Sequence, residues 1–529
     1  MLSLGERIPA PAQRVGPGGP ARLRGGLRLR PRLWVVGPLA LFALLRVPSL
    51  LEPHWYTDEA GYVTSARALL QGKTLYAQLW TNKPPIHLWT VAAWIQVFGT
   101  SEAALHVLTL LTGLLTLLAV AYAGCRLLGR PRTVIALLIG AILLGTPLFD
   151  GELLLPESLL IAPVSWAGAV LLTRVTSPDI RRWPVWPAAV GALAALAVAY
   201  QQTAIAETCA FGLVIALVPA GSRSRRLALY AGTVVVLTGA WLVPSILTAG
   251  VTAVGYALAG FYVGFTQGRW TGGFGATAFH LLLPLGALAL LVFSAWLRRR
   301  DHSAAWGLWL WAGAALLIPA VARQPYAHYL VPSLAPSALA ASSVRVAIPT
   351  VTNLPQRLAA LGLAAGAGLA GWGASATSLD WVGAGGSDLT LAMYYGGAAS
   401  VLTRHQSLLA WQDGFDYRVS EDRQVNAWLS LHGLQGSTAV VWSADAWLYA
   451  DSQLQLLLPT PPIYNDEVLL GSDPGTAQVV GDLDPEIVIT EGSARSALPA
   501  INAIIQDGYR QVDQAGSEIV WLRDDRVTP

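Results

Sequence analysis

Residues 52–85 combine side chains that can exchange protons with side chains that can hold an anion. The stretch contains the adjacent acids Asp58 and Glu59, and it contains Lys73 and Lys83, the two lysines among 34 basic residues. A positioned carboxylate can take a proton from a reacting group, and a fixed cation can stabilise a developing negative charge. The plain alternative is that Asp58 and Glu59, which follow Thr57, cap a helix and face solvent.

The elements around this stretch determine where these side chains lie. Thr57, Asp58 and Glu59 are typical of a helix start, and Tyr62 and Leu69 give the predicted helix an apolar face. Such a helix is expected to lie on a membrane surface and to hold Asp58 just above the lipid.

The composition indicates an integral membrane protein. Hydrophobic residues make up 54% of the chain and charged residues 12%, whereas ordinary soluble domains are roughly a quarter charged. Apolar runs suited to a hydrocarbon core of about 30 Å occur at eleven places, namely 33–51, 103–124, 133–149, 158–173, 184–200, 203–219, 227–247, 276–297, 304–321, 328–347 and 357–373.

The placement of arginine predicts the orientation. If the short apolar run 86–99 lies in the interface and does not cross, the loops on the side of the N-terminus hold 21 cations and the opposite loops hold five. The positive-inside rule then places the N-terminus, with a disordered basic tail at 1–32, in the cytoplasm. We therefore expect an interfacial helix at 86–99 and a first outer loop at 52–102.

The last part of the chain, residues 376–529, lacks long apolar runs and predicts a soluble α/β domain outside the cytoplasm. Segments 437–442, 486–490 and 518–522 indicate strands. Segments 444–458 and 494–507 favour helices.

Several motifs resemble one known family. The acid pair after the first span, the helix that ends in Gly72-x-x-x-Tyr76, and Asn82-Lys-Pro-Pro85 resemble the protein O-mannosyltransferases and lipid A aminoarabinose transferases. Phe98-Gly-Thr-Ser-Glu102 and Tyr329-Leu-Val-Pro332 extend the resemblance, which covers roughly residues 33–350. It implies an all-α polytopic membrane protein of the GT-C fold, with about 11 transmembrane helices in a catalytic domain at 33–375, followed by the small extracytoplasmic α/β domain.

The resemblance also implies a glycosyltransferase. Such enzymes take a sugar from a polyprenyl-phosphate donor and pass it to a hydroxyl of a protein, a lipid or a cell-envelope glycan, usually with inversion. Asp58 is implied as the base that accepts the hydroxyl proton. Lys83, at the family's Lys-Pro-Pro position, is implied as a cation that stabilises the departing phosphate. The alternative for Lys83 is a lysine that extends along the membrane interface.

Further positions match the family less closely. Arg269, at the end of the aromatic stretch 261–270, and Tyr329 are implied near the donor phosphate, with His328 beside them. Glu157 matches the second acid, which orients the acceptor or a metal, and Glu59 is its companion candidate. Ordinary alternatives are an interfacial arginine, an aromatic of the membrane belt and an acid at a helix N-terminus.

The expected partners are the donor lipid, membrane lipids and an unidentified hydroxyl acceptor, without nucleic acid, at the plasma membrane. No cofactor is assigned, and a divalent metal stays an open alternative without designated ligands. Glu207, inside a predicted span, has no assigned role. A transporter or lipid flippase would instead carry polar groups on interrupted helices in inverted repeats, and a membrane anchor for the C-terminal domain would need fewer spans.

Overall fold

The computed structural model describes residues 33–177, 184–218, 222–263, 274–300, 305–322, 326–344, 389–443, 446–461, 474–491, 505–506 and 508–526. The predicted tail at 1–32, the predicted span at 357–373 and Arg269 lie outside these residues.

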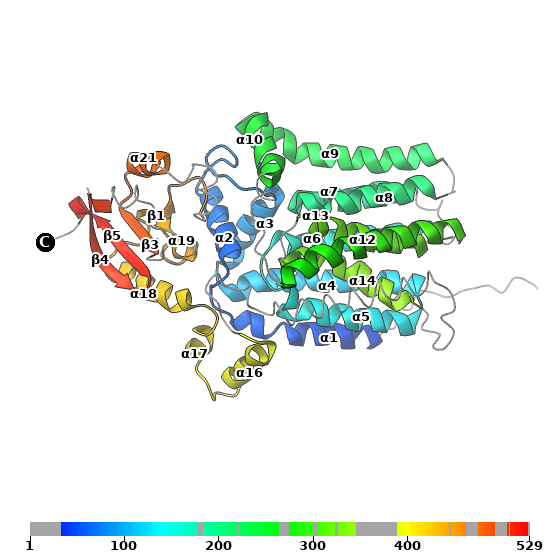
Figure 1. The fold of residues 1–529 in the computed structure, drawn as a ribbon, viewed down its shortest axis with the longest axis horizontal. Coiled ribbons are helices and arrows are strands. Elements are labelled where there is room, and N and C mark those ends of the chain that lie inside the picture. Colours follow the sequence, from blue (N-terminus) through cyan, green and yellow to red (C-terminus); the bar gives the residue numbers. More distant parts are fainter. Residues whose placement is uncertain are drawn as a thin grey trace, which may run out of the picture.

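A helical bundle forms the larger part of the described chain (Figure 1). Its members coincide with the first ten predicted apolar runs, which are therefore confirmed as helices: α1 (Leu33–Leu45), α4 (Glu102–Leu127), α5 (Arg130–Gly145), α6 (Pro156–Val175), α7 (Trp186–Tyr200), α8 (Ile205–Leu217), α9 (Arg223–Ala249), α12 (Phe274–Arg300), α13 (Ala305–Ala322) and α14 (Val331–Ser343).

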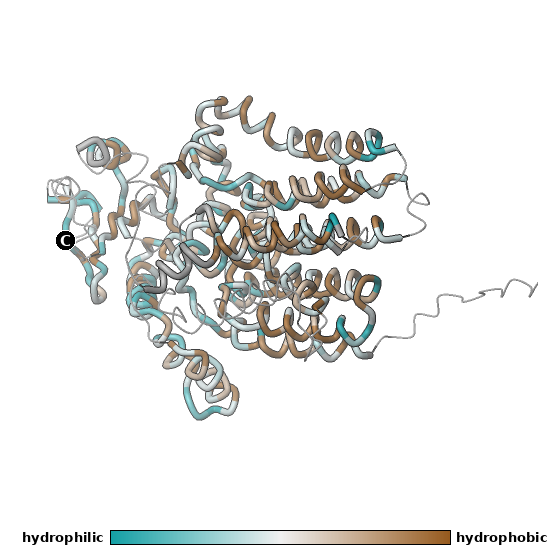
Figure 2. The backbone as a smooth tube through the Cα atoms, turned by 45° about the vertical axis from the view of Figure 1, so that its right-hand side comes forward, coloured by the Kyte–Doolittle hydropathy of each residue, from teal (hydrophilic) through white to brown (hydrophobic). Residues whose placement is uncertain are grey.

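The bundle helices are as hydrophobic as helices that lie in a bilayer. Figure 2 shows hydrophobic residues along them, with hydrophilic residues mainly at their ends and in the C-terminal part. Four segments among the described residues are long and apolar enough to cross a membrane by length and composition, namely Trp34–Leu51, Glu102–Leu127, Pro156–Val175 and Arg223–Ala249. Several bundle helices are shorter than this measure, so eleven crossings stay a prediction.

Local sequence sets where the helices begin and end. Proline occupies the first turn of α5, α6 and α7, where its missing N–H has no partner to lose. Gly250, with φ of 86°, ends α9 in the left-handed region that glycine adopts without a Cβ clash. These signals let the chain reverse direction within a few residues.

Small residues allow the helices to pack closely. A Cβ added to Gly168 of α6 would lie 2.6 Å from the Trp311 ring of α13, and one on Gly191 of α7 would lie 2.7 Å from the Tyr230 carbonyl oxygen of α9. Close approach through glycine is a common way to pack helices in a bilayer. It fixes α6, which begins with Pro156-Glu157, within the bundle.

One end of the bundle, here called the site end, is covered by short elements (Figure 1). A short 3₁₀ helix (Pro48–Leu51) leads from α1 to α2 (Thr57–Leu70), and α3 (Pro85–Phe98) packs against α2 and α7. α10 (Val251–Gly255) continues into a π-helical turn (Tyr256–Gly260). The helices predicted at 57–70 and 86–99 are confirmed as helices, and α3 ends at Gly99, with φ of 81°.

The C-terminal part lies beyond the site end (Figure 1). Its sheet has the order β2-β1-β3-β5-β4, in which β1 is parallel to β2 and β3, and β5 is antiparallel to β3 and β4. The strands are β1 (Thr438–Trp442), β2 (Gln455–Leu456), β3 (Ile487–Glu491), β4 (Tyr509–Ala515) and β5 (Glu518–Arg523), and the helices are α16 (Leu391–Leu402), α17 (Leu408–Gln412), α18 (Tyr417–Leu431), α19 (Trp447–Asp451) and α21 (Pro474–Leu483).

The three predicted strands are confirmed as β1, β3 and β5. The helix predicted over 444–458 is wrong in extent, because α19 ends at Asp451 and Gln455–Leu456 pair with β1 as β2. Tertiary pairing overrides local propensity in so short a segment. Most of the segment predicted as a helix at 494–507 lies outside the described residues.

Candidate active site

Helix α2 places the first acid pair at the site end. Asp58 and Glu59 stand in its first turn, and no side chain caps the N-terminus. The other face of α2 meets the C-terminal part, where Thr64 Oγ1 donates to the Ala446 carbonyl at 3.0 Å and Arg67 donates to the Ala450 carbonyl at 2.5 Å. The helix is therefore held between the bundle and the C-terminal part and does not have a solvated face.

Lys83 is buried, with an exposed fraction of 7%, so it does not extend along a membrane surface. The turn that carries it is fixed by Tyr76, whose hydroxyl donates to the Lys83 carbonyl at 2.6 Å. Burial lowers the pKa of Lys83, but Tyr262, Glu157 and Asp58 raise it, and the net pKa lies above the ordinary value. The electrostatic environment therefore favours the charged ammonium form of Lys83.

Glu157 opens α6 and is buried. Gln201 lies in the break between α7 and α8, and its Nε2 donates to Glu157 Oε1 at 2.8 Å. This contact holds the carboxylate toward the break. The structure therefore supports more than a helix-cap position for Glu157, since a side chain from another helix orients it.

Gln202 connects the loop that carries Asn82 and Lys83 to the π-helical turn. Its Nε2 donates to the Asn82 carbonyl at 2.9 Å and to the Leu258 carbonyl at 3.2 Å. Tyr262 donates to the same Asn82 carbonyl at 3.3 Å. Tyr262 belongs to the aromatic stretch 261–270, and this contact places the start of that stretch beside Lys83.

A cavity of about 290 Å³ opens next to these groups. Apolar side chains supply most of its wall, and Glu157, Gln201, Gln202, Glu207 and Tyr329 are among the polar groups in it. Its lining residues are Glu157, Leu160, Gln201, Gln202, Thr203, Ala204, Ile205, Glu207, Leu258, Ala259, Tyr262, Ala315, Ile318, Pro319, Tyr329 and Pro332. Such a wall suits a ligand that has an apolar chain and a charged head.

The segment before α14 closes another side of the site. Tyr329 lines the cavity, and His328 stacks on Tyr326 with the ring centroids 5.4 Å apart. His328 Nδ1 lies 3.3 Å from Asp150 Oδ2. Asp58 and Glu157 act electrostatically on both His328 and Tyr329, so these residues from four separate segments form one site.

Of the predicted site residues, Glu157 and Tyr329 line the cavity, and Asp58 and Lys83 are linked to them electrostatically. Glu59 differs, because it is fully buried and contacts His106 at 3.6 Å. Glu207, which had no predicted role, lines the cavity.

Sequence reasoning missed three polar residues of the site. Gln201 and Gln202 interrupt two apolar runs, and Asp150 does the same between α5 and α6. Asp150 also has a φ of 52°, an uncommon backbone conformation for a residue other than glycine. Short polar interruptions of apolar runs are the sequence signal that could have identified these residues.

The groups around Lys83 do not fit a metal-binding site. Lys83 acts electrostatically with Asp58 and Glu157, and Gln201 donates to one Glu157 oxygen. A divalent cation between the same carboxylates would be repelled by the ammonium ion. That Glu157 orients a metal stays a prediction.

No family model matches the chain, and no curated protein is similar to it in sequence. Its fold is similar to that of ArnT from Cupriavidus metallidurans bound to undecaprenyl phosphate, with a TM-score of 0.60 and 15% identity over 92% of this chain and 97% of that chain. The apo state of the same protein gives a TM-score of 0.57 and 16% identity over the same shares. The chain has the GT-C fold that the sequence resemblance implies.

Proposed function

We propose that this chain is a membrane glycosyltransferase that moves a sugar from a polyprenyl-phosphate donor to a hydroxyl acceptor. One observation carries the proposal, namely that Glu157, which acts electrostatically on Lys83 together with Asp58, lines a largely apolar cavity in a GT-C fold. The ArnT structure with undecaprenyl phosphate supports a lipid-linked donor of this kind.

The geometry supports a division of roles. The cavity wall accommodates the first part of a prenyl chain, and the phosphate binds the Lys83 ammonium ion, which is linked electrostatically to the lining residues Tyr262 and Glu157. As the glycosidic bond to phosphate breaks, negative charge grows on the phosphate oxygens, and a fixed cation stabilises it without rearrangement. Tyr262 and Tyr329, which border the same region, supply hydroxyl donors.

Asp58 is the proposed base. It removes the acceptor hydroxyl proton while the oxygen attacks the anomeric carbon, and Glu157, oriented by Gln201, positions the acceptor or the sugar. Attack on the face opposite the departing phosphate inverts the anomeric centre. Arg269 stays a proposed phosphate contact from a segment outside the described residues.

The proposed orientation places the site end and the C-terminal part outside the cytoplasm. Helix ends rich in arginine, those of α4, α5, α6 and α9, lie at the opposite end of the bundle (Figure 1). This arrangement follows the positive-inside rule. The sugar would then be transferred at the outer face of the plasma membrane.

The test is transfer by the purified protein in lipid nanodiscs. A panel of polyprenyl-phosphate sugars with radiolabelled sugar groups is incubated with cell-envelope lipids and proteins, and release of label from the donor is followed. The wild-type protein should transfer label, and Asp58→Asn should not. Donor movement across the bilayer without any transfer would overturn the proposal in favour of a flippase.

A further inference from the structure

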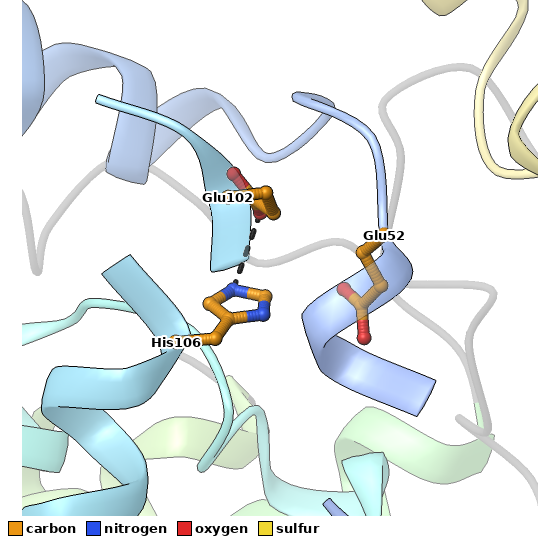
Figure 3. Close-up of side chains that lie close together, drawn as sticks. All are labelled: Glu52, Glu102 and His106. Atoms are coloured by element: carbon orange, nitrogen blue, oxygen red, sulfur yellow. Dashed lines mark ion pairs between the residues drawn. The ribbon is translucent and has the colours of Figure 1, made fainter. Parts of the chain in front are cut away.

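A second group of ionisable side chains lies close together (Figure 3), and none of its members lines the cavity. Glu52 follows the first 3₁₀ helix, Glu102 is the first residue of α4, and His106 stands one turn further along α4. One ligand atom from each of these three side chains lies within 4.8 Å of the other two. All three side chains are buried.

The position of His106 leaves one ring nitrogen available. Its Nδ1 lies 2.6 Å from the Ser49 carbonyl oxygen, which can only accept, so Nδ1 carries the proton. In the neutral ring Nε2 then has a lone pair, and it lies 3.2 Å from a Glu102 oxygen and 3.6 Å from a Glu59 oxygen. A histidine whose other N–H donates to a backbone carbonyl is the usual form of a metal ligand.

Several atoms in this group have unmet hydrogen-bonding capacity. Both carboxylate oxygens of Glu102, Oε2 of Glu59 and Nε2 of His106 are buried and have no hydrogen-bond partner within the part of the chain that the structure describes. Leaving a buried polar atom unpaired costs about 1–3 kcal/mol. Two of these atoms, Glu102 Oε1 and His106 Nε2, face each other at 3.2 Å, a separation that a shared metal ion would also produce.

Glu52 is held differently. Tyr394 Oη donates to its Oε1 at 2.5 Å, and Trp55 Nε1 donates to its Oε2 at 3.1 Å. Carboxylates that bind metals are commonly oriented by hydrogen bonds of this kind from surrounding residues. The two donors fix Glu52 against rotation and leave its remaining lone pairs for an ion.

The charges of the group are unbalanced. Glu52, Glu59 and Glu102 lie around His106, and a second histidine, His54, lies 3.6 Å from Glu102. Arg46 Nη1 lies 3.8 Å from Glu152 Oε2. A divalent cation would balance the negative charge of these carboxylates.

We propose that Glu52, Glu102 and His106 bind one divalent transition-metal ion of the Zn²⁺ class. One imidazole with carboxylates is a donor set that Zn²⁺ accepts, with bonds of about 2.0–2.2 Å. Tetrahedral bonds of that length separate neighbouring ligand atoms by about 3.3–3.6 Å, which matches the 3.2 Å between His106 and Glu102. Glu59 or water takes the fourth position.

The ion would have a structural role. Its ligands join the end of α1 to α4, Glu59 joins α2 to the same point, and Tyr394 joins α16. Asp58 is the neighbour of Glu59 on α2, so the ion would fix the helix that carries the proposed base without contacting substrate.

The test is metal content and metal-dependent stability of the full-length protein in nanodiscs. Wild-type protein purified without chelator should hold about one Zn²⁺ per chain by mass spectrometry. After removal of metal with a chelator, added Zn²⁺ should raise Tm, and added Co²⁺ should give the visible absorption bands of a four-coordinate site. Glu102→Gln should lower the bound metal at least tenfold, whereas Glu152→Gln, an equally buried acid paired with Arg46, should keep it.

Two results would overturn the proposal. One is folded wild-type protein that holds no metal and shows neither a Zn²⁺-dependent Tm nor Co²⁺ absorption, because the acids then share protons instead. The other is equal metal content in wild type and Glu102→Gln, which assigns the ion to another part of the chain. If Glu102→Gln does not fold, the titration of metal-free wild-type protein with Zn²⁺ and Co²⁺ still shows whether the protein binds the metal.

Discussion

Glu59 Oε1 accepts a hydrogen bond from the Leu154 backbone N–H at 2.7 Å. The contact joins the helix that begins beside Asp58 to the segment that leads into Glu157 on α6. Two acids that are far apart in the sequence therefore have a fixed spacing through the residue next to one of them. Glu59 is on this basis a positioning residue.

Two substitutions of Glu59 test whether it holds α2 in place or takes part in the transfer reaction. Glu59→Gln keeps an acceptor oxygen for the Leu154 N–H, so we expect transfer activity within about tenfold of wild type. Glu59→Ala leaves that N–H buried and unpaired, at a cost of about 1–3 kcal/mol, and we expect lower Tm and a larger loss of kcat. The measurements are Tm and transfer kinetics, and equal activity of the two variants would contradict the positioning role.

Asp58→Asn removes the proposed base with little change in shape. We expect kcat to fall about 10²–10⁴-fold, the usual contribution of a positioned general base, while Tm changes little. Asp482→Asn, an exposed acid on α21, is the matched control and should transfer normally. Full activity of Asp58→Asn would remove Asp58 from the mechanism.

Lys83→Met tests the phosphate cation. We expect kcat to fall about 10²–10³-fold, as when one group that stabilises developing negative charge is removed. The other lysine, Lys73, donates to the Leu456 carbonyl at 2.5 Å outside the cavity, and Lys73→Met should keep most of the activity. Equal losses in the two variants would show that Lys83 acts only through folding.

The pair His54 and Asp451 makes docking of the C-terminal part depend on pH. The two side chains are 2.8 Å apart, and His54 also stacks on Trp447. Burial opposes protonation of His54, but Asp451 and then Glu102 outweigh it and raise its pKa from 6.5 to about 9. Because the folded-state pKa is the higher one, the stabilisation is complete below about pH 6.5 and is lost as pH rises through about 9.

At about 1.4 kcal/mol for each pH unit between the two pKa values, the stabilisation is at most about 3.5 kcal/mol. Limited proteolysis of the segment between α14 and the sheet measures how firmly the C-terminal part is docked. Cleavage of the wild type should accelerate between pH 6.5 and 9, whereas Asp451→Asn should be cleaved fast throughout. Parallel pH profiles would rule out the pair as the cause.

The sequence predicts the bundle well because an apolar run long enough for a bilayer is a direct physical signal. The helix that starts at Thr57 follows from its local start signal, and the convergence of Asp58, Lys83 and Glu157 stays a prediction from the topology and the family resemblance. In contrast, β2 exists only because Gln455–Leu456 pair with β1, and no local pattern shows this.

The group of Glu52, Glu102 and His106 is partly readable in the sequence. Glu102 and His106 are four residues apart and so share a helix face. Glu52, however, reaches them because α1 and α4 meet through Arg46, which donates to Thr109 at 2.6 Å. Such a meeting depends on packing between helices, which a single sequence does not encode locally.

The first loop is completed by main-chain contacts with the far end of the chain. Trp80 N–H donates to the Pro459 carbonyl at 2.7 Å, and the partners of Arg67 and Lys73 are each 383 residues further on. Residues 450–459 therefore support the loop that carries Lys83. We expect this loop to reach its final conformation only after the C-terminal part has been synthesised and has folded.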